Sequence, residues 1–447
     1  SQLKNQGISL IITVDCGTTA FEPLAYAKEI GVDVIVLDHH TAEPKLPEAV
    51  AIINPNRLDE NSPLTTVAAV GISFIFAVAL NSALRQQGFY HNRPTPDLLS
   101  LLDLVALGTV CDVMPLHGLN RAFVKQGLKI MARRSNIGLK ILCDIAGMCE
   151  KPTAYHLGFV LGPRINAGGR VGEAGLGSLL LRCDDTSLCQ KAAEKLNTYN
   201  EERKAIEEMV LEQALSQAEQ QLHRPVIMVA GQGWHPGVIG IVAGRLKERY
   251  LRPTCVVSFD ESGEGKGSGR GVPGMNLGAM VHAARQSNII LGGGGHAMAA
   301  GFSLTQDQLL PFHHFLEKKM EALTIDNTPM LILDGALSLN AVNVSLIHEL
   351  ETLAPYGVGN PSPKFAFGHI HLVKTFIIGQ NHVKCFFRQL DGTSLEGIAF
   401  RCLEDSLGEF LLQSQKKPIH IAGSLHLNTW MGEEKPQLII EDAAPAL

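Results

Sequence analysis

The sequence lacks paired cysteines, although it contains nine cysteines in total. A disulfide framework or a zinc knuckle needs paired spacing, and no CxxC pair occurs, so both are excluded and reduced thiols in a cytoplasmic protein are expected. Long apolar runs are also missing. The most apolar stretch, residues 67–80, holds 14 residues, whereas a membrane-crossing helix needs about 20. We interpret it as a buried helix and expect no membrane partner.

A secretory leader and an initiating methionine are absent from the N-terminal residues. The apolar run 8–14 is too short for the h-region of a signal peptide, and no basic segment with a cleavage site surrounds it. The chain begins at Ser1 and enters a strand-like run within seven residues. These features are typical of the middle of a longer protein, so the chain is expected to be a fragment.

An excess of basic residues, which would favour nucleic-acid binding, is missing as well. The net charge is −6, and residues 1–120 hold twelve acidic against six basic residues, whereas residues 121–447 hold 32 of each. Carboxylates gathered in the first quarter suit a role in binding cations. A solvated acidic surface explains the same counts, and the counts alone favour that interpretation.

The composition is that of a globular protein. Of the 447 residues 45% are apolar and 18% are charged, which is enough for a sizeable core and about three domains. Strand-like runs at residues 9–14, 33–37 and 50–53, with a helical pattern at 23–30, predict a right-handed βαβ unit in a parallel sheet. Helical segments follow, and this first α/β domain is expected to occupy residues 1–185.

Three further regions are predicted downstream. Residues 186–222 form an amphipathic pattern typical of a long helix that connects two domains. Residues 223–325 predict a smaller α/β domain. From residue 330 to residue 447 the pattern changes to several short alternating strands, and their number and size favour an OB-like β-barrel.

Residue types that bind metals follow two of the predicted strands. Asp15 comes directly after the first strand, and Asp38, His39 and His40 come after the second. The carboxyl ends of parallel strands meet at one edge of a sheet, so neighbouring strands would place these side chains roughly 5 Å apart. Such a set suits Mn²⁺ or a similar ion, and a bridging carboxylate suits two ions about 3.5–4 Å apart. Taken singly, Asp15 is better explained as a helix cap and the histidine pair as packing, but their matched positions favour a site.

A third carboxylate, Asp112, follows the nearly uniform apolar run 98–110. A carboxylate at the end of so buried an element is costly unless it is paired or bound to a metal. The alternative is that Asp112 caps the start of a helix.

Two glycine-rich segments in the smaller α/β domain suggest a grip on phosphate. Residues 267–271 present Arg270 among glycines, and residues 292–295 precede an expected helix start, where backbone amides attract anions. Residues 245–285 hold seven basic against four acidic residues. Tight turns are the alternative, which the glycines alone favour. A Walker A loop is excluded because Lys266 is followed by glycine.

The motifs TVDCG, DHH and GTVCDVMPL, in this order, resemble the later metal motifs of the DHH phosphoesterase superfamily. The downstream segments LGPRINAGGR, GSGR and GGGGHA resemble the RecJ family of exonucleases specific for single-stranded DNA. The resemblance covers nearly the whole chain. The tripeptide DHH is a weak signal alone, but the ordered set is highly specific.

This resemblance implies a role for each candidate metal-site residue. Asp15 would bridge two ions, and His39 and Asp112 would be ligands of one of them. His40 would face the scissile phosphate, while Asp38 would orient the neighbouring imidazoles. The implied cofactor is Mn²⁺ or Mg²⁺, with two ions in the complete protein.

The resemblance also implies the substrate and the residues that bind it. Two groups are implied: Arg164, Asn166 and Arg170 along the DNA path, and Ser268, Arg270 and His296 near the 5′ end. The implied activity removes 5′-mononucleotides from single-stranded DNA in the 5′→3′ direction, in DNA repair and recombination. A cytoplasmic monomer is expected, with a single-strand-binding protein and a helicase as further partners.

One motif of the family, an Asp-x-Asp on an earlier strand, is absent from this chain. At most one ion is therefore expected here, and the chain is expected to bind DNA while being nearly inactive. Another DHH phosphoesterase, either a pyrophosphatase or a short-oligonucleotide nuclease, and a catalytically impaired DNA-binding fragment remain alternatives. In the OB-like region one or two of seven aromatic residues are expected to stack on DNA. The seven are Phe365, Phe367, Phe376, Phe386, Phe387, Phe400 and Trp430.

Overall fold

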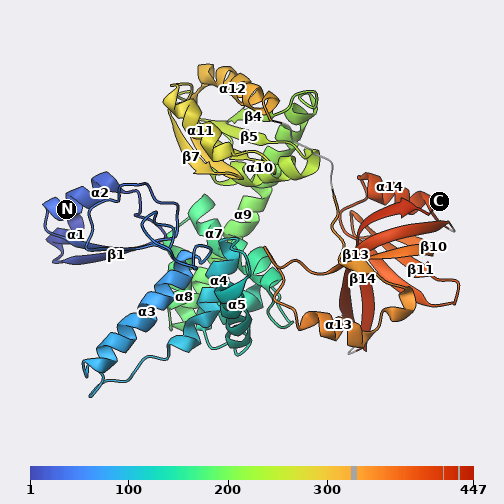
Figure 1. Cartoon of the computed structure of the whole chain (residues 1–447), viewed down its shortest axis with the longest axis horizontal. Helices are drawn as coiled ribbons and strands as arrows, with labels where there is room; N and C mark the ends of the chain where they lie inside the picture. The colour runs from blue at the N-terminus through green and yellow to red at the C-terminus, as the bar shows by residue number, and fades with distance from the viewer. Residues whose placement is uncertain (324–329, 416, 431–432, 447) are drawn as a thin grey trace. The chain divides into compact units, whose positions relative to one another are not determined.

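The computed structural model describes residues 1–323, 330–415, 417–430 and 433–446. The chain divides into two compact units, which are described separately. Unit 1 comprises Ser1–Arg133, Lys151–Gly158 and Met330–Leu447, and unit 2 comprises Arg134–Glu150 and Phe159–Pro329. The expected α/β class with a parallel sheet, a long helix and a C-terminal barrel is confirmed (Figure 1).

Unit 1 begins with a three-stranded parallel sheet of order β1-β2-β3. Its elements are α1 (Gln2–Asn5), β1 (Leu10–Val14), α2 (Phe21–Glu29), β2 (Asp33–Leu37) and β3 (Ala51–Ile53). Val14 pairs with Leu37, and Leu37 pairs with Ile53, so the three strands end at one level. The predicted βαβ unit is therefore present, and the two segments that carry the candidate metal ligands leave neighbouring strands at the same edge.

The helical part of unit 1 packs on this sheet through a small apolar core around Leu37, Val67, Ile72 and Phe123. Its elements are α3 (Ala69–Gln86), a 3₁₀ turn (Leu98–Leu101), α4 (Leu102–Cys111) and α5 (Gly118–Met131). Contacts with this core concentrate at the N-terminal half of α3, which Figure 1 shows as a long single helix.

The expectation of a buried helix at residues 67–80 is wrong. Helix α3 has 18 residues, and the buried ones, Ala69, Gly71 and Ile72, belong to its first turn. Val78 and Leu80 are 45% and 47% exposed, because nothing in the described residues covers the second half of the helix. Its length and mean hydropathy of 1.4 also meet the requirements of a membrane-crossing helix. A single helix of this kind does not establish a membrane protein, since core helices have the same features.

Unit 2 combines helices with a five-stranded sheet of order β4-β5-β6-β8-β7. Its main elements are α6 (Ile137–Ile145), α7 (Gly162–Val171), α8 (Gly175–Arg182), α9 (Thr186–Glu219), β4 (Ile227–Gln232), α10 (Pro236–Tyr250), β5 (Thr254–Phe259), β6 (Glu264–Arg270), α11 (Leu277–Gln286), β7 (Gly292–His296), β8 (Ala299–Thr305) and α12 (Leu309–Glu321). A π-helical turn (His156–Leu161) precedes α7. Strands β4 and β5 are parallel, and the other neighbours are antiparallel.

The two glycine-rich segments are strands, so the expectations of loops at both and of a helix start after residue 295 are wrong. Residues 267–270 belong to β6 and residues 292–296 form β7. Their glycines make room for neighbouring side chains: a Cβ on Gly267 would lie 2.0 Å from the ring of Phe302, and one on Gly293 would lie 2.7 Å from Val281. The missing side chains therefore permit close packing inside a sheet.

The C-terminal part of unit 1 is a closed barrel (Figure 1). Its elements are β9 (Gly335–Ala336), a 3₁₀ turn (Leu339–Ala341), α13 (Val344–Glu351), β10 (Lys364–Ile378), β11 (His382–Arg388), β12 (Ser394–Ala399), α14 (Ser406–Gln413), β13 (Pro418–Trp430) and β14 (Glu433–Pro445). Strands β10 to β14 follow the order β11-β12-β14-β13-β10, and β10 pairs again with β11 to close the ring. Five strands in this order make the expected OB barrel.

Candidate metal centre and phosphate-binding residues

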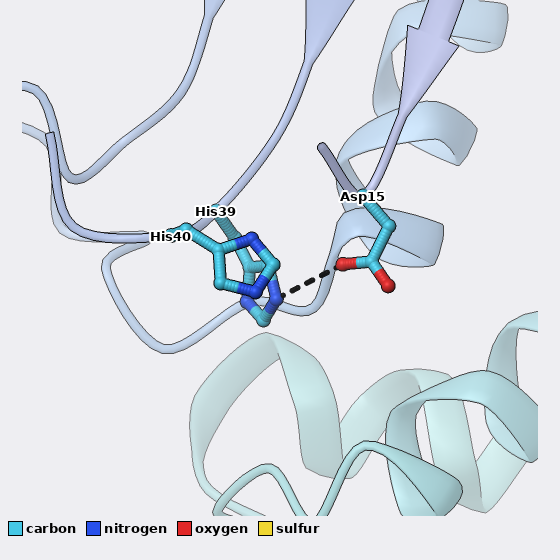
Figure 2. A group of neighbouring side chains, drawn as sticks. All are labelled: Asp15, His39 and His40. Atoms are coloured by element: carbon cyan, nitrogen blue, oxygen red, sulfur yellow. Dashed lines mark ion pairs between the residues drawn. The ribbon is translucent and has the colours of Figure 1, made fainter. Parts of the chain in front are cut away.

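Asp15 follows the last residue of β1 and points toward the end of β2. Its backbone N–H donates to the carbonyl of Leu37 at 2.9 Å, which extends the ladder by one residue. Its φ of +62° lies in the left-handed region, which aspartate tolerates better than most residues. One carboxylate oxygen, Oδ1, lies 3.2 Å from Nε2 of His39 (Figure 2). The backbone conformation thus aims an exposed carboxylate across the edge of the sheet.

Asp38 is buried directly after β2, and its carboxylate contacts the main chain of His39 and the ring of His40. Its carboxylate accepts hydrogen bonds from the N–H of Thr18 at 3.0 Å, the N–H of His39 at 2.8 Å and Nδ1 of His40 at 2.7 Å. Burial alone would raise the pKa of Asp38, but these hydrogen bonds lower it to about 2. Burial likewise opposes protonation of His40, yet the bond to Asp38 and the charges of Asp15 and Asp112 raise the pKa of His40.

Three residues that the sequence analysis missed hold the Asp38–His40 segment in place. Asn54 donates to Oγ1 of Thr18 at 2.8 Å and to the carbonyl of His40 at 2.9 Å. Asn56 donates to the carbonyl of His39 at 2.5 Å. The sequence could have indicated two of them. Asn54 and Asn56 follow the third strand of the same sheet, so they emerge at the same edge as Asp15 and His39.

Asp112 reaches the same cluster from the end of α4, where it is the C-cap residue. The alternative that it caps the start of a helix is therefore wrong. Its Oδ2 lies 3.4 Å from Nε2 of His39, and this buried oxygen has no hydrogen-bond partner in the described part of the chain. Burial, followed by the charge of Asp15, raises the pKa of Asp112. The next residue, Val113, has a φ of +58°, a strained conformation that costs about 1–3 kcal/mol.

These groups fit a divalent ion. One ligand atom from each of Asp15, His39 and His40 lies within 4.8 Å of the others. Figure 2 shows these three side chains gathered at the end of the sheet. The carboxylate of Asp112 approaches the same imidazole of His39 with its unsatisfied oxygen. Mixed carboxylate and imidazole ligands suit Mn²⁺, and a buried carboxylate oxygen without a donor is costly unless a cation meets it. Of the residues singled out for this site, the structure brings Asp15, His39, His40 and Asp112 together and places Asp38 behind them.

In unit 2 the residues expected near a 5′ end share one face of the sheet. Arg270 pairs with Ala299, and Ala299 pairs with His296, so Arg270 and His296 lie in one row across three strands. Ser268 lies two residues before Arg270 on the same face, and its Oγ is 3.2 Å from Nη1 of Arg270. Helix α10 approaches both closely, because a Cβ on Gly240 would lie 3.1 Å from each side chain.

The residues expected along the DNA path lie on α7, and they differ in their contacts. Arg164 donates to Oδ1 of Asn197 at 2.9 Å and to the carbonyl of Val160 at 2.8 Å. Two of its N–H donors are therefore used in hydrogen bonds within the protein. Asn166 is exposed. Arg170 donates to the carbonyl of Gly237 in the first turn of α10 at 2.9 Å. Arg170 therefore lies beside the helix that also contacts Ser268.

Four arginines concentrate positive charge in this part of unit 2. Burial, followed by the charge of Arg170, lowers the pKa of Arg270, so the two guanidinium groups are near one another. Behind them Glu207, which is only 3% exposed, pairs with Arg203 at 2.5 Å and with Arg245 at 2.6 Å. One buried carboxylate among four guanidinium groups leaves an excess of positive charge, as an anion site requires.

Known protein families match three parts of the chain. The DHH family N-terminal domain matches residues 2–109, the DHHA1 domain matches residues 198–322, and the RecJ OB domain matches residues 333–442. The fold and the carboxylate–histidine cluster thus define a DHH-family protein that carries a DHHA1 domain and an OB domain.

Comparison with individual proteins shows to which family within this class the chain is similar. The chain is 36% identical over 463 residues to the single-stranded-DNA-specific exonuclease RecJ of Escherichia coli, covering 99% of this chain and 78% of that protein. The identity to RecJ of Bacillus subtilis is 35%, covering 99% of this chain and 55% of that protein. The crystal structure of RecJ from Thermus thermophilus with Mn²⁺ superposes with a TM-score of 0.83 at 30% identity, covering 98% of this chain and 62% of that one. The chain belongs to the RecJ family, as its ordered motifs predicted.

Proposed function

We propose that this chain forms the core of a metal-dependent exonuclease that removes 5′-mononucleotides from single-stranded DNA in the 5′→3′ direction, in DNA repair and recombination. The observation that carries the proposal is the unsatisfied carboxylate of Asp112 facing the imidazole of His39, with Asp15 opposite. The names of the relatives support the substrate class, and structures of the family with Mn²⁺ and Mg²⁺ support the cofactor. The proposed domains are residues 1–185, 223–325 and 330–447, with residues 186–222 as the connecting helix.

In this proposal Asp15, His39 and Asp112 hold the ion. A bound divalent ion supplies Lewis acidity, which makes a water molecule nucleophilic and neutralises charge on the phosphate. Asp38, ionised because its pKa is about 2, can only accept, so Nδ1 of His40 carries the proton of their hydrogen bond. The imidazole of His40 is proposed to face the substrate phosphate. The hydrogen bond to Asp38 favours the protonated imidazole, which would donate to a phosphate oxygen.

Hydrolysis of a 3′-labelled single strand by the 447-residue chain tests the function. We expect slow, Mn²⁺-dependent shortening from the 5′ end, with mononucleotides as the product and no reaction in EDTA. It should be slow because the described cluster supplies ligands for one ion, whereas two ions clamp the attacking and leaving oxygens most effectively. Shortening from the 3′ end would contradict the proposal. Faster cleavage of pyrophosphate or of dinucleotides would favour another DHH phosphoesterase, and binding without any turnover would favour an impaired fragment.

The arginine-rich face of unit 2 is proposed to hold the 5′-phosphate. A guanidinium matches a terminal phosphate with two parallel hydrogen bonds, and the hydroxyl of Ser268 adds a donor beside Arg270. A 5′-hydroxyl end offers no such charge. The chain should therefore prefer a phosphorylated end.

Arg270→Ala is expected to reduce that preference about tenfold, since a charge-assisted hydrogen bond is worth about 1.5–3 kcal/mol. The measurement is competition between 5′-phosphorylated and 5′-hydroxyl oligonucleotides for the chain. Arg285→Ala, at the exposed end of α11, is the control and should leave the preference unchanged. Equal weakening for both oligonucleotides in Arg270→Ala would mean that Arg270 only supports the sheet.

The barrel offers a surface for the rest of the strand. Phe376 on β10 lies directly across from Lys384 on β11, and Lys374 lies across from Phe386, so two rings and two ammonium groups share one outer face. The rings meet edge to face at 5.9 Å, and each ammonium lies over a ring, at 4.1 Å for Lys374 on Phe376 and 5.1 Å for Lys384 on Phe386. Of the seven aromatic residues named in this region, Phe367 and Phe387 are buried. The side chain of Trp430 lies outside the described residues.

This face is proposed to stack bases. Strand β11 is the second strand of the barrel, and OB barrels bind oligonucleotides on the face of their second and third strands. Arg388 adds a third cation to the face, whereas Glu396, paired with Lys384 at 2.7 Å, is the acidic side chain beside it. The positive balance complements a phosphate backbone, and Phe376, at 41% exposed, is open to a base.

Phe376→Ala is expected to weaken binding of an oligo(dT) strand about fivefold or more, because base–aromatic stacking is worth about 1–3 kcal/mol per base. Fluorescence anisotropy with a labelled oligonucleotide measures the change. Ile377→Ala removes an exposed apolar side chain from the other side of β10 and should have no effect. If Phe376→Ala binds the oligonucleotide as tightly as the parent chain, or if both variants lose the same affinity, the proposal that bases stack on this face is contradicted.

A further inference from the structure

A segment between α13 and the barrel contacts the loop that joins α4 to α5. In this segment, residues 353–360, the carbonyl of Val358 accepts a hydrogen bond from the N–H of Leu116 at 2.7 Å. The carbonyl of Leu353 accepts another from the guanidinium of Arg121, in the first turn of α5, at 2.5 Å. Residues about 240 positions apart in the sequence are thus joined by main-chain atoms of the segment, which we call the strap.

Two glycines allow the strap to approach so closely. A Cβ on Gly357 would lie 2.8 Å from the side chain of Leu116, which is buried. A Cβ on Gly359 would lie 2.8 Å from the ring of His117 and 2.9 Å from Cβ of Pro115. Gly359 also has a φ of +74°, a conformation that glycine adopts without strain.

The strap is braced internally. The side-chain amide of Asn360 donates to the carbonyl of Pro355 at 2.8 Å and to that of Leu353 at 3.1 Å. The main chains of Gly357 and Asn360 exchange two hydrogen bonds, at 2.9 and 3.1 Å. A segment closed in this way keeps its shape, so it can hold a neighbouring loop rather than follow it.

The loop that the strap contacts is the one that carries Asp112. Only three residues separate Asp112 from Leu116, and Val113 between them is held at a φ of +58°. A strained residue of this kind persists only where its surroundings fix the chain on either side. Helix α4 fixes one side. On the other side the amide of Asn120 donates to the carbonyl of Pro115 at 3.0 Å, and the strap secures Leu116.

We propose that the strap is a positioning element of the metal site. By holding Leu116 it keeps the Asp112 carboxylate aimed at His39, so the segment leading into the OB barrel helps to set the affinity for the ion. The proposal rests on the metal site of the proposed function. It adds that residues without any atom at the site, Gly359 and Asn360 above all, control how tightly the site binds Mn²⁺.

Mn²⁺ titration calorimetry on the whole 447-residue chain tests this inference. Gly359→Ala pushes the strap away from the loop, and Asn360→Ala loosens the strap without adding an atom. Each is expected to weaken Mn²⁺ binding about tenfold with unchanged stoichiometry, as changes behind metal ligands commonly do. The matched control is Gly392→Ala in the turn between β11 and β12, where φ is +90° and nothing lies within 4 Å of the added Cβ.

Melting temperatures in EDTA separate positioning from folding. Asn360→Ala should melt close to the parent chain without metal, yet need more Mn²⁺ to reach the same occupancy. Unchanged Mn²⁺ affinity in Asn360→Ala would overturn the proposal even if Gly359→Ala fails to fold, and so would an equal loss in Gly392→Ala. A parent chain that binds no Mn²⁺ would contradict the metal site itself, and the strap proposal with it. A parent chain that binds Mn²⁺ as tightly as its strap variants would contradict the strap alone.

Discussion

Asp15→Asn is expected to lower the Mn²⁺ affinity of the chain about a hundredfold while leaving its affinity for single-stranded DNA unchanged or slightly higher. The substitution removes the anionic ligand that faces His39 across the end of the sheet. Asparagine tolerates the φ of +62° that alanine would strain, so the variant separates charge from conformation. When DNA binding is measured in EDTA, where no ion is bound, loss of a negative charge near the phosphate cannot weaken it electrostatically.

Titration calorimetry with Mn²⁺ and anisotropy with a labelled oligonucleotide give the two values. Asp33→Asn is the matched control, because Asp33 is an exposed carboxylate at the opposite end of β2. It should change neither value. If Asp15→Asn binds Mn²⁺ as tightly as the parent chain, Asp15 is not a metal ligand. The assignment of the whole cluster as a metal site would then be wrong.

Asp38→Asn is expected to lower the free energy of unfolding by about 2 kcal/mol at pH 7, which is the energy equivalent of lowering a pKa from 3.8 to about 2. Because the folded-state pKa is depressed, this stabilisation is present above the unfolded pKa of about 3.9 and is lost as the pH falls through about 2. The difference between the parent chain and the variant should therefore shrink between pH 4 and pH 2.

Urea unfolding of the metal-free chain at several pH values measures this difference. The variant should also lose Mn²⁺ affinity, since the amide nitrogen that replaces Oδ2 cannot accept from the N–H of Thr18, and the neutral amide oxygen binds His39 and His40 more weakly than a carboxylate does. Asp33→Asn again serves as the control and should give a curve parallel to that of the parent chain. A constant difference across the acid range would mean that Asp38 is not the buried anion described above.

The edge of the first sheet was predictable because local patterns determine it. A βαβ unit brings the ends of its two strands together whatever the rest of the chain does, so Asp15 and His39 could be placed side by side from spacing alone. Asp112 could be joined to them only through the resemblance, because its position depends on how α4 packs, and no local pattern encodes that contact.

The glycine-rich segments show where local reasoning fails. A run of glycines is compatible with a phosphate-binding loop and with a tightly packed strand, and the deciding neighbours, Phe302 and Val281, are not next to them in the sequence. Helix α3 was misjudged for a related reason, since apolar composition does not say whether a partner covers it. The contacts of the strap, residues 353–360, with the Asp112 loop could not be predicted from the sequence either, because they join distant parts of the chain.

Anomalous scattering from manganese in crystals of this chain tests the central claim most directly, because it locates the ion without depending on turnover. We expect a single manganese peak, within bonding distance of Asp15, His39 and Asp112, with His40 beside it. A crystal grown in millimolar Mn²⁺ with no peak among these residues would contradict the account, and so would two fully occupied ions in this chain.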